Sequence, residues 1–193
     1  MHSDGFAEAL MSPERKKWQD PEKVVREIGV GAGMSVADLG CGPGFFTLPL
    51  AMAVGGTGKV YAVDSNERML SHLKSNVQAL GAPPRAAIVP IAADVAATGI
   101  PSGTVDVAFF ANVLHDLAEP AAFLKELRRI LRKGSGSVAV DIDWDKVETG
   151  VGPPLGIRLS ADESRAILSK GGFEVTKPIY GGRFHYGLLC KVR

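Results

Sequence analysis

One segment constrains the fold of this 193-residue chain more than any other, an apolar strand that runs into a glycine-rich turn. The strand is predicted over residues 35–39, a helix over 45–53, and a second strand over 59–63 that ends in Asp64. Three glycines alternate through the turn, at Gly40, Gly42 and Gly44. Glycines allow the backbone to approach a ligand closely, and a carboxylate accepts hydrogen bonds from ribose hydroxyls. This order of elements predicts a βαβ unit that binds a nucleotide.

The spacing of the glycines indicates which kind of nucleotide fits. A dinucleotide-binding turn has the pattern G-x-G-x-x-G, which requires a third glycine at the position of Phe45. The third glycine comes one residue earlier, at Gly44, and the acid Asp38 precedes the first glycine. An acid at this place suits a ligand with a positive end and little phosphate. S-adenosylmethionine, with its ammonium, sulfonium and adenosine groups, has that character.

Residues 38–44, Asp-Leu-Gly-Cys-Gly-Pro-Gly, resemble the first motif of the class I S-adenosylmethionine-dependent methyltransferases. From about residue 20 onward the chain is similar to the type 11 and UbiE-like group of that family. The resemblance implies S-adenosylmethionine as cofactor and S-adenosylhomocysteine as product. It implies one methyltransferase domain over residues 1–193, with residues 1–33 as an N-terminal helix and lid segment. It also implies a Rossmann-like, doubly wound α/β fold: three αβα layers around a seven-stranded sheet of order 3-2-1-4-5-7-6, with the last strand antiparallel.

The rest of the chain alternates between strand and helix patterns. Residues 1–19 are expected to be irregular, whereas Asp20 and Pro21 predict the capped start of a helix that ends at Gly29. Further strands are predicted over residues 87–92, 105–110, 137–142, 173–180 and 184–192. Further helices are predicted over residues 67–80, 119–132 and 161–170. Strands that alternate with helices predict a parallel sheet, to which a closing hairpin adds one antiparallel strand.

Charge and composition limit the classes of partner. The 22 lysines and arginines nearly balance 21 aspartates and glutamates, so the net charge of +1 gives no general attraction to nucleic acid. No stretch approaches the roughly 18 apolar residues of a membrane helix, and the N-terminus lacks a signal-peptide pattern, so a cytoplasmic protein is expected. Cys41 and Cys190 are too far apart to suggest a disulfide framework or a zinc site. The expected partner is a small-molecule acceptor, and the expected assembly is a monomer or homodimer.

Ligands of open α/β sheets bind beyond the carboxyl ends of the strands, and here those ends carry polar residues. Asp38 would hold the methionine end of the cofactor or cap the following helix. Asp64 would accept from both ribose hydroxyls or cap the helix that follows it. The resemblance implies that Asp94 accepts from the adenine amino group, the alternative being an exposed turn residue. The predicted cofactor-binding residues are Asp38, Gly40, Gly42, Gly44, Asp64, Asn66, Ala93, Asp94 and Asn112.

His115 is the candidate catalytic residue. An imidazole with an unperturbed pKa of about 6.5 can take a proton from an acceptor at neutral pH. The neighbouring Asp116 would orient the ring or raise its pKa. The alternative is a histidine that caps the next helix or shapes the floor of the pocket. Since a base is needed only where the acceptor loses a proton, His115 suits an oxygen or nitrogen acceptor.

Three acids alternate at the end of the predicted strand over 137–142, at Asp141, Asp143 and Asp145. A period of two places them on one face of the strand. A solvated strand end, or acids that hold an acceptor, is favoured over a metal site, so no metal is expected. The resemblance implies that residues 152–160 line the acceptor pocket, where Arg158 would bind an anionic acceptor or pair with an acid such as Asp143. The candidate substrate-binding residues are Trp18, Trp144, Arg158 and His185.

The sequence thus predicts an enzyme that moves a methyl group from S-adenosylmethionine to an unidentified small molecule. A protein or RNA methyltransferase and a non-catalytic scaffold that binds S-adenosylmethionine remain alternatives. A nucleic-acid methyltransferase is less favoured, because residues 112–115 read Asn-Val-Leu-His where Asn-Pro-Pro-Tyr would be expected. A nicotinamide dehydrogenase is disfavoured by Phe45.

Overall fold

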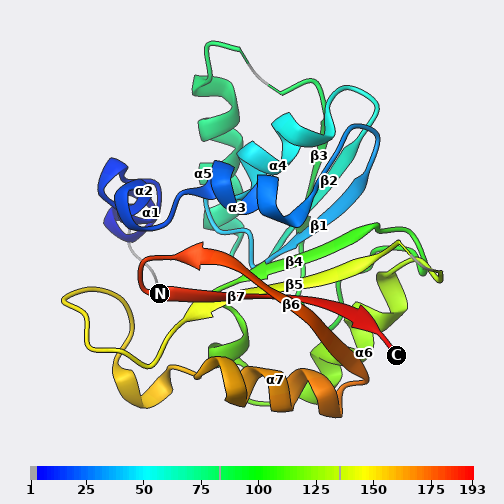
Figure 1. Ribbon diagram of the computed structural model, residues 1–193. Helices are drawn as coiled ribbons and strands as arrows, with labels where there is room; N and C mark the ends of the chain where they lie inside the picture. Colours follow the sequence, from blue (N-terminus) through cyan, green and yellow to red (C-terminus); the bar gives the residue numbers. More distant parts are fainter. Residues whose placement is uncertain (1–3, 83, 135) are drawn as a thin grey trace.

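A seven-stranded sheet forms the centre of the computed structural model, which describes residues 4–82, 84–134 and 136–193 (Figure 1). Its order is β3-β2-β1-β4-β5-β7-β6, which confirms the predicted topology. The strands are β1 Ser35–Leu39, β2 Lys59–Asp64, β3 Ala87–Ala92, β4 Val107–Ala111, β5 Val138–Trp144, β6 Phe173–Gly182 and β7 His185–Val192. Strands β1 to β5 pair in parallel, and β7 runs antiparallel between β5 and β6. The five parallel strands therefore present their carboxyl ends along one edge.

Helices cover both faces of this sheet, as predicted for a three-layer fold (Figure 1). The helices of the sheet region are α3 Pro21–Ile28, α4 Thr47–Val54, α5 Glu67–Ala79, α6 Pro120–Ile130 and α7 Ala161–Lys170. Apolar residues of α3 and α4 pack on one face, against Val36, Phe109 and Ile142. Phe123 of α6 and Leu168 of α7 belong to the core on the opposite face. The parallel strands β1, β2, β4 and β5 are thus buried on both sides, which holds their ends in fixed places, whereas β3 is a partly exposed edge strand.

The helix boundaries follow the capping signals in the sequence. Asp20 accepts a hydrogen bond from the Lys23 amide at 2.9 Å, and Pro21 occupies the first turn of α3. Ser160 and Glu163 form a capping box at the start of α7. Each cap satisfies amide groups that a helix end leaves unpaired, which explains why these helices begin where the sequence predicts.

The prediction that residues 1–19 are irregular is wrong. The chain forms α1 Asp4–Leu10 and α2 Pro13–Trp18, and residues 1–3 of the predicted N-terminal segment lie outside the described part. Ser12 caps α2 by accepting from the Arg15 amide at 3.2 Å, and proline follows it as the first helical residue. A capping residue followed by proline is the same signal that correctly predicts the start of α3, and it also marks the start of α2.

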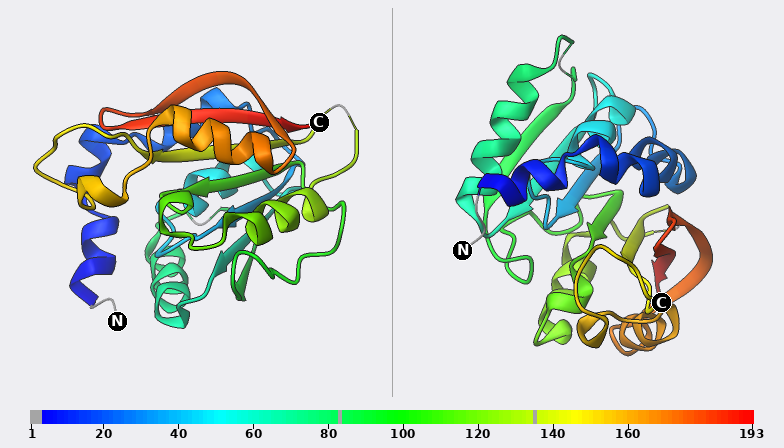
Figure 2. Two further views of the ribbon diagram at one scale, coloured as in Figure 1. Left: turned by 90° about the horizontal axis from the view of Figure 1, so that it is seen from below. Right: turned by 90° about the vertical axis from the view of Figure 1, so that its left-hand side faces the viewer.

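The N-terminal strap (residues 4–19) crosses the side of the molecule toward which β5 points (Figures 1 and 2). The loop between β5 and α7 lies at the same side in both views. Among the described residues, no helix is long and apolar enough to cross a membrane. Cys41 and Cys190 are both free and buried.

Candidate cofactor and acceptor site

The glycine turn leaves β1 in a conformation that only glycine adopts readily. Gly40, Gly42 and Gly44 all have positive φ angles, of 75°, 53° and 100°. A Cβ atom on Gly40 would lie 2.5 Å from Val113 Cγ2, and one on Gly44 would lie 2.5 Å from Leu73 Cδ1. These two glycines are therefore also required by the packing of the protein itself.

Gly42 differs from the other two glycines of the turn. A Cβ atom built on it would have Leu10 Cδ1, at 3.9 Å, as its nearest side-chain neighbour. This side of the turn is thus less crowded than at Gly40 and Gly44, and the group that reaches it is the end of the Leu10 side chain from the N-terminal strap. A ligand could make close contact with the backbone here if that flexible side chain moved.

Asp38, at the end of β1, is a buried acid beside the turn. Its side chain is only 2% exposed, and Oδ2 accepts a hydrogen bond from the Thr47 hydroxyl at 2.6 Å. Burial raises the pKa of Asp38 to about 7, and the charge of Asp64 adds to the rise while Thr47 and Arg15 oppose it. A positive group arriving here would stabilise the ionised carboxylate. This is the property that the predicted contact with the ammonium group requires.

Asp64, at the end of β2, ties the glycine turn to the start of α5. Its Oδ2 accepts from the Gly42 amide and its Oδ1 from the Asn66 amide, both at 2.8 Å. Asn66 itself caps α5 by accepting from the Arg68 amide at 3.1 Å. Since each carboxylate oxygen has two lone pairs, Asp64 keeps acceptor capacity for ribose hydroxyls.

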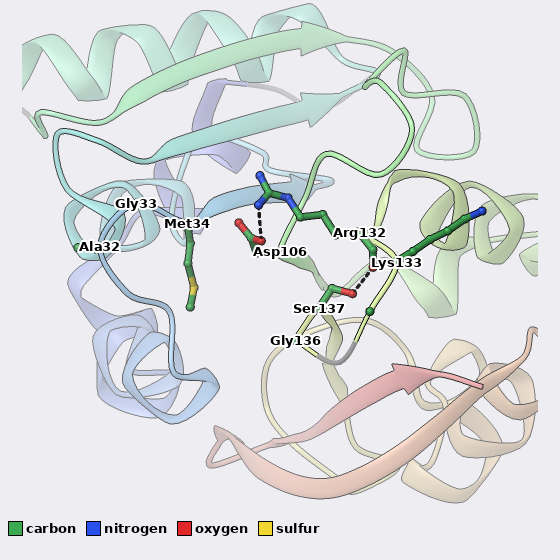
Figure 3. A pocket seen from close by; sticks show the side chains of 9 residues that line it. Ala32, Gly33, Met34, Asp106, Arg132, Lys133, Gly136 and Ser137 are labelled. Carbon is green, nitrogen blue, oxygen red and sulfur yellow. Dashed lines mark hydrogen bonds and ion pairs between the residues drawn. The ribbon is translucent and has the colours of Figure 1, made fainter.

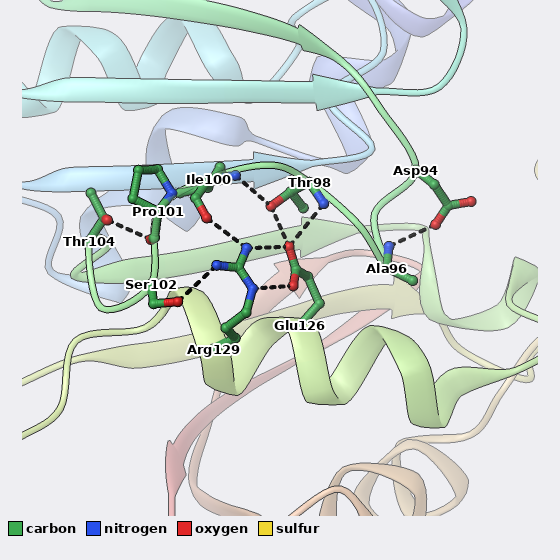
Figure 4. A network of polar contacts seen from close by, with 9 residues as sticks. All are labelled: Asp94, Ala96, Thr98, Ile100, Pro101, Ser102, Thr104, Glu126 and Arg129. Atoms are coloured by element: carbon green, nitrogen blue, oxygen red, sulfur yellow. Dashed lines mark hydrogen bonds and ion pairs between the residues drawn. The ribbon is translucent and has the colours of Figure 1, made fainter.

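The segment after β3 carries the predicted adenine contacts. Asp94 Oδ1 accepts from the Ala96 amide at 2.7 Å, and the side chain is exposed (Figure 4). The Ala93 amide donates to Asp64 O at 3.2 Å. This amide is therefore already engaged in extending the contact between β2 and β3.

A polar network holds the chain between Asp94 and β4 against α6 (Figure 4). Glu126 Oε1 accepts from the amide and the hydroxyl of Thr98, at 2.9 and 2.6 Å. Arg129 binds both Glu126 oxygens and also donates to Ile100 O at 2.6 Å. The hydrogen bond from Arg129 lowers the pKa of Glu126 to about 2 against the effect of burial, and Thr98 contributes to the lowering. The network fixes the loop that follows Asp94.

Asn112 follows β4 and holds an unusual conformation. Its φ of 59° is the only positive value among the described non-glycine residues, and its amide donates to Ile142 O at 2.7 Å. Its Oδ1 is buried without a hydrogen-bond partner in the described structure. A strained residue with an unsatisfied buried oxygen is often part of a ligand site. The oxygen would suit a donor such as an ammonium or hydroxyl group.

His115 lies just beyond β4, in the short helical turn η1 Leu114–Asp116, and its side chain is 5% exposed. Its Nδ1 is 2.6 Å from Asp143 Oδ1, and its amide donates to Asp143 Oδ2 at 3.2 Å. Because Asp143 accepts from Nδ1, the lone pair of the neutral ring is on Nε2. Burial alone would lower the pKa of His115, but the hydrogen bond and charge of Asp143 outweigh it and raise the pKa above 6.5. The ring has the geometry of a general base.

Asp143, rather than the predicted Asp116, is the closer partner of His115. Asp116 Oδ1 is 3.4 Å from Nε2, and this carboxylate is 67% exposed. The solvated strand end expected at Asp141 and Asp143 is wrong, because both side chains are fully buried. Sequence reasoning missed the pairing because the two residues are 28 positions apart. The adjacency of β4 and β5 in the predicted sheet was the signal that could have found it.

Asp141 lies two residues before Asp143 on the same face of β5. Both of its carboxyl oxygens are buried without a hydrogen-bond partner in the described structure. Burial, and then the charge of Asp143, raises the pKa of Asp141 well above its ordinary value, while the nearby Ser164 hydroxyl opposes the rise. Within the described residues, no three histidine, cysteine or acidic side chains are grouped to hold a metal ion.

Three of the four predicted substrate-binding residues come together. His185 stacks on Trp18, with ring centres 5.6 Å apart, and packs against Trp144 at 4.1 Å. Both ring nitrogens of His185 are buried without a partner in the described structure. Burial lowers the pKa of His185 to about 3, helped by nearby positive charge, so the ring is neutral at physiological pH. The cluster joins the strap to β5 and β7.

The fourth predicted residue, Arg158, is committed to the loop between β5 and α7. Its guanidinium donates to three carbonyl oxygens and to the Thr149 hydroxyl at 2.8–2.9 Å, the carbonyls being those of Val147, Val151 and Pro153. It also lies over the Trp144 ring, with Cζ 4.9 Å from the ring centre. Asp143 is not among its described hydrogen-bond partners, and Arg158 is only 3% exposed to solvent. The geometry supports a role in shaping the loop rather than direct binding of an anion.

Arg15 and Gln19 of the strap were missed by sequence reasoning. Arg15 Cζ lies 3.9 Å from the centre of the Phe45 ring, next to the glycine turn. Burial lowers the pKa of Arg15 to about 10, with Asp38 opposing the change, so the group stays charged at neutral pH. Gln19 Nε2 donates to Gly181 O at 3.3 Å and ties the strap to the end of β6. The capped helix start at Ser12 was the one feature of the sequence that could have indicated a structured strap.

Two hollows lie away from this edge of the sheet. One, of about 480 Å³, is at the amino-terminal edge and is lined by Ala32, Gly33, Met34, Asp106, Arg132, Lys133, Gly134, Gly136 and Ser137 (Figure 3). The other, of about 450 Å³, lies between α6 and α7. Neither contains a predicted site residue, so the candidate site rests on the convergence of side chains at the carboxyl edge.

Known proteins are similar to this chain in sequence and in fold. Residues 37–139 match the family model of the methyltransferase domain. A crystal structure of a SAM-dependent methyltransferase from Aquifex aeolicus has a TM-score of 0.90 and 33% identity, and the match covers 100% of both chains. The 2-phytyl-1,4-naphtoquinone methyltransferase of Trichormus variabilis is 31% identical over 138 residues, which are 72% of this chain and 58% of that protein.

The demethylmenaquinone methyltransferase of Staphylococcus aureus is 27% identical over 128 residues, 66% of this chain and 50% of that protein. The chain thus spans about half the length of these two curated relatives. The resemblance to class I S-adenosylmethionine-dependent methyltransferases is confirmed by the family match and by the Aquifex structure. Because the matched segment covers more than half of the chain and contains the glycine turn, the chain belongs to the methyltransferase domain family.

Proposed function

We propose that the protein transfers a methyl group from S-adenosylmethionine to a hydroxyl or amine of a small molecule, with His115 as the general base. The observation that carries the proposal is the His115–Asp143 pair, held at the end of β4 beside the glycine turn. A buried imidazole that donates Nδ1–H to a buried carboxylate is arranged to accept a proton at Nε2.

The residues around the turn fit S-adenosylmethionine. The space beside Gly42 admits a ligand against the backbone, and Asp38 and Asp64 lie at the two strand ends that flank the turn. Asp38 would hold the ammonium group and Asp64 the ribose hydroxyls, while the unsatisfied oxygen of Asn112 offers a further acceptor. S-adenosylmethionine bound there would supply a methyl group on a positively charged sulfur, which makes the methyl carbon electrophilic.

His115 and Asp143 divide the work of proton transfer. Nε2 would take the proton from the acceptor hydroxyl or amine as that oxygen or nitrogen receives the methyl group, the methyl–sulfur bond breaks and S-adenosylhomocysteine leaves as a neutral thioether. Asp143 Oδ1, 2.6 Å from Nδ1, stabilises the imidazolium that results. The protein otherwise has to orient the acceptor and exclude water, and orientation alone can contribute roughly 7–11 kcal/mol in favourable systems.

We propose that the strap closes over the site as a lid, because it already bridges the turn and the β6–β7 hairpin.

The aromatic cluster favours a flat, uncharged acceptor. Trp18, Trp144 and the neutral His185 now pack on one another, and an acceptor would bind among these rings once the strap moves aside. The imidazole would then offer it one donor and one acceptor. Two relatives are methyltransferases of demethylmenaquinone and of 2-phytyl-1,4-naphtoquinone, and a quinone ring is flat and uncharged. We infer an acceptor of that shape that bears an ionisable hydroxyl or amine.

A methyl-transfer assay with labelled S-adenosylmethionine and a panel of small hydroxylated aromatic compounds tests the proposal. The wild type should label at least one compound, and His115→Ala should abolish labelling while S-adenosylhomocysteine still binds. Glu119→Gln is the matched control, because it removes an exposed charge just before α6, four residues beyond His115. Full activity of His115→Ala would remove the general base from the account, and binding without transfer to any acceptor would favour a scaffold.

A further inference from the structure

A buried arginine from the N-terminal strap lies against the glycine turn. Arg15 is 7% exposed, and its guanidinium stacks on Phe45, the residue after Gly44, with Cζ 3.9 Å from the ring centre. Its Nη1 donates to the carbonyl of Leu10 at 3.0 Å. The side chain of Leu10 is also the nearest group to the open side of Gly42. Arg15 therefore approaches the turn from the side that Leu10 covers, where only the end of a flexible side chain lies against Gly42.

The hydrogen-bonding capacity of Arg15 is only partly used. A guanidinium has five N–H groups, and the described contacts employ three of them. Nε and Nη2 donate to Gln19 Oε1 at 3.1 and 2.9 Å, and Nη1 donates to Leu10 O. All of these acceptors are neutral. Among the described residues Arg15 makes no ion pair within 4.0 Å, although a buried arginine normally has a negative partner.

Asp38 is the complementary buried charge on the other side of the turn. Its recorded side-chain hydrogen bond is to the neutral Thr47 hydroxyl, and the described ion pairs do not join it to Arg15. The two groups are close enough for each to affect the ionisation of the other. The protein thus holds one positive and one negative group, both buried, without pairing them.

We propose that Arg15 binds the α-carboxylate at the methionine end of S-adenosylmethionine, while Asp38 faces the α-ammonium of the same amino-acid group. An α-amino acid carries both charges on one carbon, so a single ligand would satisfy both buried side chains. The planar fork of an arginine also matches the two oxygens of a carboxylate. This inference rests on the proposed function and adds a cofactor residue that lies outside the glycine motif.

Binding of two probes to the full chain, measured by calorimetry, tests the proposal. The first probe is S-adenosylhomocysteine, and the second is its decarboxylated form, which keeps the ammonium and the adenosine. The wild type should bind the first at least about 10-fold more tightly than the second. Arg15→Met should weaken S-adenosylhomocysteine by roughly 10–100-fold and the decarboxylated form by no more than about 3-fold. Arg15→Lys should recover part of the loss, because it keeps the charge but not the fork.

Lys16→Met is the matched control, since it removes the same charge from the adjacent, exposed position of α2. It should leave both affinities unchanged. Equal weakening of the two probes by Arg15→Met would show that Arg15 acts only by holding the strap, and would overturn the proposal. Equal binding of the two probes by the wild type would overturn it as well, even if Arg15→Met failed to fold. Tight binding of S-adenosylhomocysteine in either case leaves the proposed function intact, whereas absence of binding overturns both.

Discussion

The two halves of the candidate site differ in how their polar groups are satisfied. In the cofactor half, around β1 and β2, both oxygens of Asp64 accept backbone amides at 2.8 Å, and Asp38 accepts a hydroxyl. In the acceptor half, around β5 and β7, Asp141 and His185 are buried without hydrogen-bond partners in the described structure. In the cofactor half the amides of Gly42 and Asn66 are therefore satisfied, whereas the buried charges of Asp38 and Arg15 have no ionic partner among the described residues. The acceptor half retains desolvated groups that cost stability and await partners.

This difference implies that the two halves control different properties of the protein. Substitutions in the cofactor half should change ligand affinity, whereas those in the acceptor half should change turnover and the dependence of the protein on pH. A substitution in the cofactor half that changed only turnover, or one in the acceptor half that changed only ligand affinity, would contradict this assignment.

The largest effect is expected from Asp143→Asn. The amide cannot stabilise the imidazolium of His115, so turnover should fall by about 10²–10⁴-fold. Affinity for S-adenosylhomocysteine should change by no more than about 2-fold, because Asp143 lies in the acceptor half. In the wild type, turnover should fall as pH decreases through a pKa above 6.5, since the base must be unprotonated. Steady-state kinetics from pH 5 to 9 checks both statements, and an unchanged profile in the variant contradicts them.

Asp64→Ala should produce the next largest effect. It removes the ribose acceptor and the partner of the Gly42 amide, so S-adenosylhomocysteine should bind roughly 10–100-fold more weakly. Glu67→Ala removes an exposed acid at the start of α5 and should have almost no effect. Calorimetric titration of both variants with S-adenosylhomocysteine would measure the difference in affinity. Equal losses in both would indicate a general electrostatic effect rather than a specific contact.

Glu126→Gln should lower the free energy of unfolding by about 1–3 kcal/mol, because it weakens the contacts of Arg129 and Thr98 at a partly solvated site. The pKa of Glu126 is lowered from 4.5 to about 2 in the folded protein. Its contribution is therefore present above pH 4.5 and is lost as the pH falls toward 2. Urea unfolding of the wild type and the variant at pH 7 and pH 3 should show a gap that narrows at the lower pH.

The smallest effect, and the only stabilising one, is expected from Asp141→Asn. The folded protein keeps a proton on Asp141 that the unfolded chain releases above its ordinary pKa of 3.8. This carboxyl therefore makes the wild type less stable as pH rises from that value. The neutral amide removes the penalty, so the variant should be more stable than the wild type at pH 8, and the difference should be smaller at pH 5. Thermal unfolding at the two pH values would detect it, and a destabilised variant would show that the carboxyl has a partner in the fold.

The same division explains what the sequence could predict. Asp38, the glycine turn and Asp64 belong to one continuous βαβ unit, so their spacing determines their relative positions. The sheet order came from the family resemblance, and the capping residues of α3 and α7 set their starts. These features depend on local sequence or on a topology shared by the family.

The acceptor half depends on contacts between distant segments. The pairing of His115 with Asp143 spans 28 residues, and the stacking of Trp18 on His185 joins the two ends of the chain. Arg158 could not be placed from sequence, because its partners are carbonyl oxygens of a loop without a regular period. Such contacts are set by how the loops fold over the sheet, which residue spacing does not reveal.

The central claim is that the glycine turn at the carboxyl edge of this sheet binds S-adenosylmethionine. Calorimetric titration of the full chain with S-adenosylhomocysteine, and separately with NADH, tests it most directly. We expect one site per chain for S-adenosylhomocysteine, with a Kd of about 10 μM or tighter, and much weaker binding of NADH. Tighter binding of NADH, or no binding of S-adenosylhomocysteine, would contradict it.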